Sequence, residues 1–408
     1  MSPPTAGTAA FDLTDPTTFV RNDPHAFWAA MRDHDPVHWH AGRGGLPGFW
    51  AVSRYADVVA AYADAARLGS ARGTVLDVLL HGDDSAGGRM LAVTDRPRHR
   101  GLRTVMLRAF SPRVLGPVVE RVERRAAELV REVTGAGGFD FAAEVAEHIP
   151  MGTICDLLSI PGADRPDLLR WNKNALSSDV ADADPYAALE ARNEILLYFM
   201  DLVERRRAEP GDDVVSMIAT AAPDGEPLSV EDVALNCYSL ILGGDESSRV
   251  SAICAVKAFA DFPDQWRAVR DGEVPVGTAV EEVLRWATPA MHFARTATTD
   301  LELGGRRIRA GDIVTLWNSS ANFDERQFDR PGRFEVARTP NKHVSFGHGP
   351  HFCLGAHLGR AELRGPAHRA GRHRVPDRSG RDAPARLLHL PQRLQQPARR
   401  LHGPLTGP

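Results

Sequence analysis

The sequence predicts a mainly α protein with a minor β part. Four long segments carry apolar residues at helical spacing: roughly 111–135, 186–208, 229–261 and 277–287. Short runs of aromatic and β-branched residues flank Gly-rich turns at 36–53 and between about 296 and 316, which is typical of β-hairpins. No Pro/Ser-rich linker interrupts the chain and no repeat period is present, so we expect one domain over most of its length.

Composition narrows the class of protein. Of the 408 residues, 43% are apolar and 25% are charged, as in globular proteins. A net charge of -4 gives no basic surplus for nucleic acid, and no run of 18 or more apolar residues predicts a membrane span. The N-terminus lacks the features of a signal peptide, and four cysteines without a Cys-x-x-Cys pair do not suggest a disulfide framework. We therefore expect a cytoplasmic protein that binds neither nucleic acid nor membrane.

The first long helix, expected over 111–135, has a recognisable start. Ser111 is a candidate N-cap and Pro112 suits the first helical position. Val118, Val122 and Leu129 then recur on one face, which we expect to be buried.

The helix expected over 229–261 is unusual at its midpoint. Ser229 is a candidate N-cap, and the first half is apolar on nearly every face, which indicates burial. Gly243 and Gly244, each costing a helix about 1 kcal/mol relative to alanine, interrupt it. They are followed by acids and hydroxyls, namely Asp245, Glu246, Ser247 and Ser248. Two interpretations stay open: a break at the glycine pair, or a groove in which a flat cofactor or small molecule approaches the backbone while the acid and hydroxyl move protons.

The segment EEVLRW places Glu282 and Arg285 on one side of the next helix. Flanking apolar residues allow a partly buried pair, but a weak surface ion pair is the usual outcome for such a spacing taken alone. Arg333, in the sequence PGRF, is a candidate third partner. Between about 296 and 316, we expect hairpin turns at Gly304–Gly305 and at Ala310–Asp312.

Cys353 lies in the segment FGHGPHFCLG, directly before a predicted helix. A sulfur near a helix N-terminus favours its thiolate form, and Gly347, Gly349 and Gly355 would let the loop lie close to a flat cofactor. Such a thiolate could ligate haem iron. A buried inert cysteine and a zinc site are the alternatives. The zinc alternative draws on four nearby histidines, His343, His348, His351 and His357.

Together these segments resemble the cytochrome P-450 superfamily, over roughly 10–363. The haem-binding signature is matched by Phe346, Gly349, Cys353 and Gly355. GGDES resembles the oxygen-activation motif, EEVLR contains the ExxR motif, and DRPRHRGLR and FARTATTD resemble segments that bind the haem propionates. The resemblance implies a single triangular domain around a buried haem b, with Cys353 as the axial ligand of the iron.

The resemblance also implies roles for individual residues. Phe346, Gly349 and Gly355 would shape the cysteine loop, and Gly243 and Gly244 the haem-side groove. Ser247, Glu246 and Asp245 would be catalytic, in oxygen activation and proton delivery. Four residues would bind the propionates: His99, Arg103, Arg295 and His351. Glu282, Arg285 and Arg333 would form a structural network, and the substrate pocket would be lined by about 72–93, 240–248 and 288–294.

The implied activity is a monooxygenase that inserts one oxygen atom of O2 into a small organic substrate. We expect a tailoring hydroxylase of natural-product biosynthesis, acting on a polyketide, an aromatic or a carrier-protein-bound intermediate; epoxidation and oxidative coupling use the same chemistry. Electrons would come from NAD(P)H through a ferredoxin and its reductase, with Arg98, Arg100, Arg103 and Arg360 as a basic dock. The alternative of another class is a zinc-stabilised helical binding protein.

The sequence departs from the superfamily pattern in two places. Gly243 and Ser247 replace the usual alanine and threonine, and serine lacks the methyl group that stiffens threonine. After Leu363, the segment 364–408 has ten arginines, no lysine and two acidic residues, with many prolines. We interpret it as an atypical Arg/Pro-rich segment, possibly a frameshift product, rather than the expected continuation of the helix. A disordered basic tail is the alternative.

Overall fold

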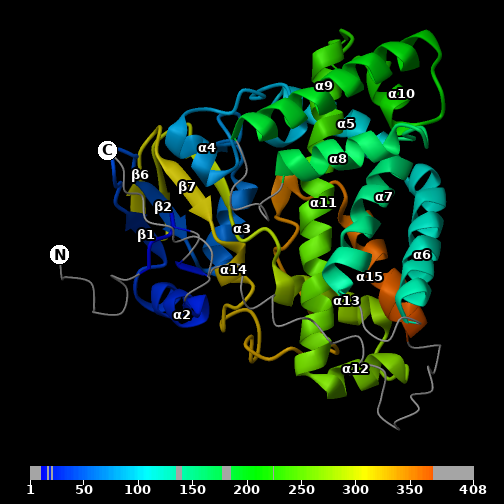
Figure 1. Ribbon diagram of the computed structural model, residues 1–408. Coiled ribbons are helices and arrows are strands. Elements are labelled where there is room, and N and C mark those ends of the chain that lie inside the picture. Colours follow the sequence, from blue (N-terminus) through cyan, green and yellow to red (C-terminus); the bar gives the residue numbers. More distant parts are fainter. Residues whose placement is uncertain are drawn as a thin grey trace, which may run out of the picture. The chain divides into compact units, whose positions relative to one another are not determined.

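A computed structural model describes residues 11–15, 18–19, 22–134, 140–176, 185–223 and 225–370. The chain divides into two compact units, which we describe separately. The first comprises Met1–Arg103 and Gly277–Ala356, and the second comprises Thr104–Val276 and His357–Pro408. Helices predominate, and the strands of the described residues belong to the first unit, as Figure 1 shows. The prediction of a mainly α protein with a minor β part is confirmed.

The first unit is built on a five-stranded sheet in the order β1-β2-β7-β4-β3. Strands β2 and β7 are parallel, and the other neighbours are antiparallel. The hairpin predicted over 36–53 is confirmed, because Val37 pairs with Val52 and His40 with Phe49. The bounds are β1 Val37–His40, β2 Phe49–Val52, β3 Leu68–Gly69, β4 Phe293–Ala297 and β7 Ile313–Leu316.

A separate two-stranded sheet pairs β5, Leu301–Leu303, with β6, Arg306–Ile308. Its turn is the predicted one at Gly304–Gly305, where both glycines have positive φ. The second predicted hairpin, at Ala310–Asp312, is wrong. This turn leads from β6 into β7, which pairs instead with β2 and β4 of the larger sheet.

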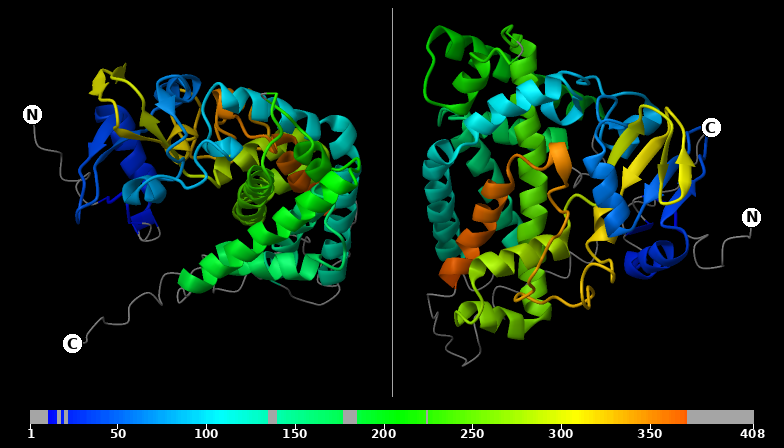
Figure 2. Two further views of the ribbon diagram at one scale, coloured as in Figure 1. Left: turned by 90° about the horizontal axis from the view of Figure 1, so that it is seen from above. Right: turned by 180° about the vertical axis from the view of Figure 1, so that it is seen from behind.

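Successive side chains of β2 point to opposite faces of the larger sheet, and both faces are buried. Phe49 and Ala51 lie in a cluster with Trp28 of α2, whereas Val52 lies in a cluster with Tyr62 of α3. Both views in Figure 2 show helices beside this sheet. The remaining helical elements of the unit are α2 Pro24–His34, α3 Tyr55–Ala63, α4 Leu76–His81, η1 Leu91–Val93, α14 Asn318–Ala321 and η3 Gly349–His351. Three described helices cross the boundary between the units, namely α5 Arg98–Ala109, α13 Val276–Ala287 and α15 Ala356–Ala370.

The second unit is a helical assembly around α11, Val230–Asp261. This helix packs against α9, Pro185–Ala208, and α7, His148–Leu157. Its predicted cap is confirmed, because the Ser229 side chain accepts a hydrogen bond from the N–H of Asp232 at 3.0 Å. The helix is continuous through Gly243–Ser248, so the interpretation of a break at the glycine pair is wrong. The other elements are α6 Pro112–Thr134, η2 Ala142–Ala146, α8 Arg165–Leu176, α10 Val214–Ala219 and α12 Pro263–Arg270.

The last described helix, α15, spans Ala356–Ala370. It therefore continues past Leu363 and includes Pro366, which corrects the expectation that proline stops it there. One proline costs a helix about 3 kcal/mol, which a helix begun several turns earlier can absorb. The rest of the atypical segment, 371–408, lies outside the described residues.

Candidate functional site

The loop that carries Cys353 is held in a fixed shape by backbone contacts within the first unit. The N–H of Cys353 donates to the carbonyl of Phe346 at 2.9 Å. Gly347 and Gly349 adopt φ values of 68° and 70°, which favour glycine. A Cβ atom at Gly349 would lie 2.6 Å from the carbonyl oxygen of Tyr62, so no larger residue fits there.

The thiol of Cys353 differs from those of the other cysteines. Its residue is exposed, whereas Cys155 and Cys237 are buried and Cys254 is partly buried. Burial raises the pKa of Cys155 to about 11 and that of Cys237 to about 12, which keeps both as inert thiols. Cys353 precedes the first residue of α15 by three positions, and a Cβ atom at Gly355 would lie 4.0 Å from its sulfur. The sulfur thus lies near a helix N-terminus with an open approach.

Four basic side chains gather beside this loop, and we call them the basic cluster: His99, Arg103, Arg295 and His351. The imidazole rings of His99 and His351 lie 4.1 Å apart between centroids. Arg103 donates to the carbonyl of Phe352 at 2.6 Å, and the buried guanidinium of Arg295 lies over the ring of Tyr62. The predicted propionate-binding residues are therefore brought together from α5, β4 and η3.

Among the residues that the structure describes, the arginines of the basic cluster have no carboxylate paired with them. Within the described part of the chain, no carboxylate forms an ion pair with Arg103 or Arg295, and the buried Nε2 of His99 has no hydrogen-bond partner. Asp95 acts electrostatically on Arg295, but its oxygens accept the N–H groups of Ser70 and Ala71.

The pKa values of the cluster follow from this imbalance. Burial, followed by His99, Arg295 and Arg103, lowers the pKa of His351 to about 3. Burial and then Arg103 lower the pKa of His99, and burial lowers the pKa of Arg295. The charge of the cluster is therefore that of its two arginines, and a buried guanidinium such as that of Arg295 is costly without an anion, so the cluster fits the carboxylates of a haem.

The second unit carries the predicted catalytic segment on one continuous helix, α11. The hydroxyl of Ser247 donates to the carbonyl of Gly243 at 2.8 Å. Nothing lies within 4 Å of a Cβ atom built at Gly243, so this side of α11 is open. A Cβ atom at Gly244 would lie 3.1 Å from Ile154, which makes Gly244 a residue for close packing against α7.

The two acids of this segment have different surroundings. Glu246 forms an ion pair with Arg249 at 2.7 Å and is partly exposed. Asp245 is buried and accepts a hydrogen bond from Asn172 of α8 at 2.6 Å. Burial raises the pKa of Asp245, and the neighbouring Glu246 adds to this effect, while Asn172 opposes it.

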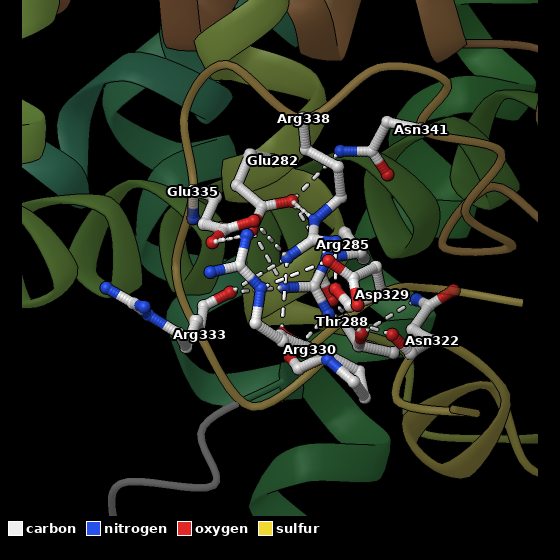
Figure 3. A network of polar contacts seen from close by, with 11 residues as sticks. Glu282, Arg285, Thr288, Asn322, Asp329, Arg330, Arg333, Glu335, Arg338 and Asn341 are labelled. Carbon is white, nitrogen blue, oxygen red and sulfur yellow. Dashed lines mark hydrogen bonds and ion pairs between the residues drawn. The ribbon is translucent and has the colours of Figure 1, made fainter.

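The predicted Glu–Arg network is fully buried, but its third member was wrongly predicted (Figure 3). Glu282 and Arg285 pair at 2.8 Å, with both side chains inaccessible to solvent. The second guanidinium on Glu282 belongs to Arg338, at 3.1 Å, and not to Arg333. Arg333 is exposed and contributes only its backbone carbonyl, which accepts from Arg285 and Arg338. Two arginines lie five residues apart in this irregular segment, and sequence spacing alone could not show which of them contacts Glu282.

Two of the three segments expected to line the substrate pocket adjoin each other in the first unit. The N–H of Ala294 donates to the carbonyl of Thr74 at 2.8 Å, which joins 288–294 to 72–93. His292 stacks on Trp317 with centroids 4.3 Å apart, and burial lowers its pKa to about 4. The third segment, 240–248, belongs to α11 of the second unit.

The zinc alternative has no support in the described residues. Among them, no group of three or more His, Cys, Asp and Glu side chains is arranged to hold a metal ion. Nor does any described helix combine the length and apolar character needed to cross a membrane.

Comparison with known proteins places the chain in a family. The Cytochrome P450 family profile matches residues 276–365. Cytochrome P450 NovI of Streptomyces niveus is 44% identical, over 86% of this chain and 86% of that protein. The steroid C26-monooxygenase of Mycobacterium tuberculosis (strain ATCC 25618 / H37Rv) is 33% identical, over 92% of this chain and 89% of that protein. A solved structure of P450 OxyD, involved in the biosynthesis of vancomycin-type antibiotics, matches with a TM-score of 0.79 and 35% identity, covering 88% of this chain and 91% of that one.

The chain therefore belongs to the cytochrome P450 family and has the P450 fold. It is a monooxygenase, hence an oxidoreductase that uses haem and O2 on a small-molecule substrate. When bound, the haem supplies O2 binding and the redox chemistry that cleaves the O–O bond.

Proposed function

We propose that the protein is a tailoring hydroxylase of natural-product biosynthesis, with Cys353 as the thiolate ligand of haem b. The observation that carries the haem assignment is the exposed Cys353 next to the partly buried basic cluster, whose arginines have no paired carboxylate among the described residues. In this proposal, His99, Arg103, Arg295 and His351 bind the propionates. Gly349 and Gly355 keep the loop close to the macrocycle, and Phe346 packs near it.

In this proposal, the side chains of α11 contribute to catalysis by transferring protons. Ser247 offers a hydroxyl on the open side of the helix, beside Gly243. Glu246, which is partly exposed, can exchange protons with solvent and is the proposed proton source. Asp245 is held by Asn172 and would position this turn of the helix.

The proposed electron source is NAD(P)H, through a reductase and an acidic ferredoxin. Helix α5 supports this proposal because it presents Arg98, Arg100 and Arg103 within two turns, and Arg100 is exposed. Arg360, on α15 of the second unit, is a separate candidate for contact with the ferredoxin. Replacing Arg100 and Arg360 by glutamate should slow reduction by the ferredoxin most at low ionic strength, and unchanged kinetics would reject the dock.

Substrate class is proposed from the relatives. OxyD, at 35% identity, is described as involved in the biosynthesis of vancomycin-type antibiotics, and this supports a role in natural-product biosynthesis, where an aromatic or carrier-protein-bound intermediate is the proposed substrate. The stacked, neutral His292 and Trp317 give the predicted pocket segment 288–294 an aromatic neighbour. Hydroxylation is the proposed reaction, and epoxidation or oxidative coupling would be distinguished by the product. A steroid is the second candidate, because a steroid C26-monooxygenase is 33% identical.

Substrate-induced spectral shifts of the purified haem protein test this assignment. We would compare an aromatic amino acid loaded on a carrier protein, the same amino acid free, and a steroid, followed by product analysis with reductant. We expect the carrier-bound aromatic to bind most tightly and to be hydroxylated. If only the steroid binds and is turned over, the second candidate, a steroid hydroxylase, would be the function.

A further inference from the structure

A cavity of about 300 Å³ in the second unit has no place in the function proposed so far. It lies between α6 and α7, which pack against each other, and Arg165, the first residue of α8, also lines it. Pockets that bind small molecules measure about 300–1,000 Å³. The cavity is therefore large enough for a small metabolite.

The walls of this cavity carry a surplus of positive charge. Two carboxylates line it, those of Glu128 and Asp156, against four guanidinium groups, which leaves two positive charges. Arg121 and Arg165 share Asp156, at 3.1 Å and 2.7 Å, whereas Arg124 forms no ion pair with any residue that the structure describes. The four arginines are Arg121, Arg124, Arg125 and Arg165. Such a surplus around one cavity favours an anionic ligand.

Two of these arginines are held in place and still have N–H groups to donate. Arg121 faces Asp156 through Nε, and its Nη groups make no hydrogen bond within the described part of the chain. Arg165 donates from Nε to the carbonyl of Ile160 at 3.1 Å and from Nη2 to Asp156 at 2.7 Å, which leaves Nη1 available. Guanidinium groups match the oxygens of phosphate, and fixing them in advance lowers the entropy lost on binding. Asp156 is thus a positioning residue.

The cavity also has an apolar wall. Val122 of α6 and Ile149 of α7 are buried hydrophobic residues that line it, and Gly152 lies three residues after Ile149. A Cβ atom built at Gly152 would meet open space, so close packing does not require glycine there. Glycine is unfavourable inside a helix compared with alanine, and at this position it keeps room beside the arginines. Apolar surface next to cations suits a ligand with an organic part as well as a negative charge.

We propose that the α6–α7 cavity binds the phosphate monoester of a small metabolite. The guanidinium groups of Arg121, Arg124 and Arg165 bind the phosphate, and Val122 and Ile149 contact the organic part. A phosphate monoester carries a charge of about -1.5 to -2 at pH 7, which balances the surplus of the cavity. The site goes beyond the proposed function and does not depend on the haem.

Isothermal titration calorimetry of the purified full-length protein, in a phosphate-free buffer at fixed ionic strength, tests the site. The probes are AMP, adenosine and inorganic phosphate. We expect AMP to bind about tenfold or more tightly than inorganic phosphate, because only AMP also uses the apolar wall. Adenosine, which lacks the phosphate, should show no measurable binding.

Substitutions locate the binding. Arg121→Gln and Arg165→Gln should each weaken AMP binding by about tenfold or more, because each removes a charge-assisted hydrogen bond. Gly152→Leu fills the cavity without changing its charge and should weaken binding by about tenfold or more. Arg170→Gln is the matched control, because Arg170 also lies on α8 but pairs with Asp167 at 2.6 Å and does not line the cavity. It should bind AMP as the wild type does.

An absence of AMP binding would overturn the site, and so would equal affinity in the wild type, Arg121→Gln and Gly152→Leu. Equal affinity for AMP and inorganic phosphate would overturn the ester and assign the arginines to the free anion. Arg124→Gln, at an exposed position, keeps the test valid if the other variants do not fold. The ferrous–CO spectrum should be the same in every variant, so failure of this site is distinguishable from failure of the proposed function.

Discussion

Two buried polar groups in the first unit look alike in composition but differ in how their charges are satisfied. Glu282 receives hydrogen bonds from Arg285, Arg338, Asn341 and the N–H of Glu335. Arg285 in turn reaches the carbonyls of Asn322, Pro331 and Arg333. The basic cluster instead gathers two arginines and two histidines, and the described residues supply no paired carboxylate.

The difference separates scaffold from binding site. A buried network whose charged groups are paired is complete without a ligand, and it ties α13 to the irregular segment that leads to the cysteine loop. A partly buried pair of arginines that lacks its anion is complete only when a ligand brings one. Arginine side chains therefore stabilise the fold in the Glu282 network and bind a ligand in the basic cluster.

The largest expected effect comes from breaking the matched network. Arg285→Met removes one partner and leaves Glu282 buried with less compensation, so the free energy of unfolding should fall by about 3–5 kcal/mol. Arg333→Met is the control, because its exposed side chain is not part of the network, and it should change stability by less than about 0.5 kcal/mol. Denaturant unfolding measures both. Equal losses of stability in the two variants would show that the Arg333 side chain belongs to the network.

Glu362 of α15, a buried acid that accepts a hydrogen bond from the hydroxyl of Ser248, should give an intermediate effect that depends on pH. The pKa of Glu362 is raised from 4.5 to about 7, so the native state holds a proton that the unfolded chain releases. Its stabilising contribution is complete below pH 4.5 and is lost as pH rises through 7. The wild type should therefore lose up to about 3 kcal/mol relative to Glu362→Gln between these values. Parallel stability curves of wild type and variant would contradict the raised pKa.

Removing members of the basic cluster should affect ligand retention more than stability. Each charge-assisted hydrogen bond is worth about 1.5–3 kcal/mol, so Arg103→Gln and Arg295→Gln should speed haem loss about 10–100-fold. Transfer of haem to an apomyoglobin acceptor measures this rate. The apoprotein should not lose stability, because the substitution removes an uncompensated buried charge. Destabilised apoprotein with unchanged haem loss would show that the cluster is structural, like the Glu282 network.

The smallest expected effect concerns the side chain that departs from the family pattern. Ser247→Thr adds a methyl group that restricts the rotamers of the hydroxyl, which donates to Gly243 in the native helix. Peroxide leakage should fall by about two- to tenfold if rotamer freedom causes it. Equal leakage in wild type and variant would contradict this explanation. Peroxide assays during NAD(P)H-driven turnover provide the measurement.

Local features were predictable from sequence, and long-range partners were not. The cap at Ser229, the hairpin of Val37 with Val52, and the glycines of the cysteine loop all follow from neighbouring residues. The partner of Glu282 depends on how the irregular segment after Pro331 folds back, and this distinguishes Arg338 from Arg333 only in three dimensions. The hairpin predicted at Ala310–Asp312 is wrong for the same reason, since strand order in the folded sheet decides which strands pair.

The buried partners of α11 were also missed. Asn172 and Glu362 lie about 70 and 115 residues from the side chains that they contact, and neither carries a local signal. The Glu362 carboxyl lies in the second turn of an apparently ordinary helix, where such a group is usually solvated, and only its burial against Ser248 distinguishes it.

The central claim is that Cys353 ligates a haem held by the basic cluster. The most direct measurement is the visible spectrum of the dithionite-reduced protein with carbon monoxide minus that without it, for wild type and Cys353→His. The account predicts the strongly red-shifted Soret band of a thiolate-ligated haem in the wild type, and an unshifted band in the variant. An unshifted band in the wild type, or the same spectrum from both proteins, would contradict it.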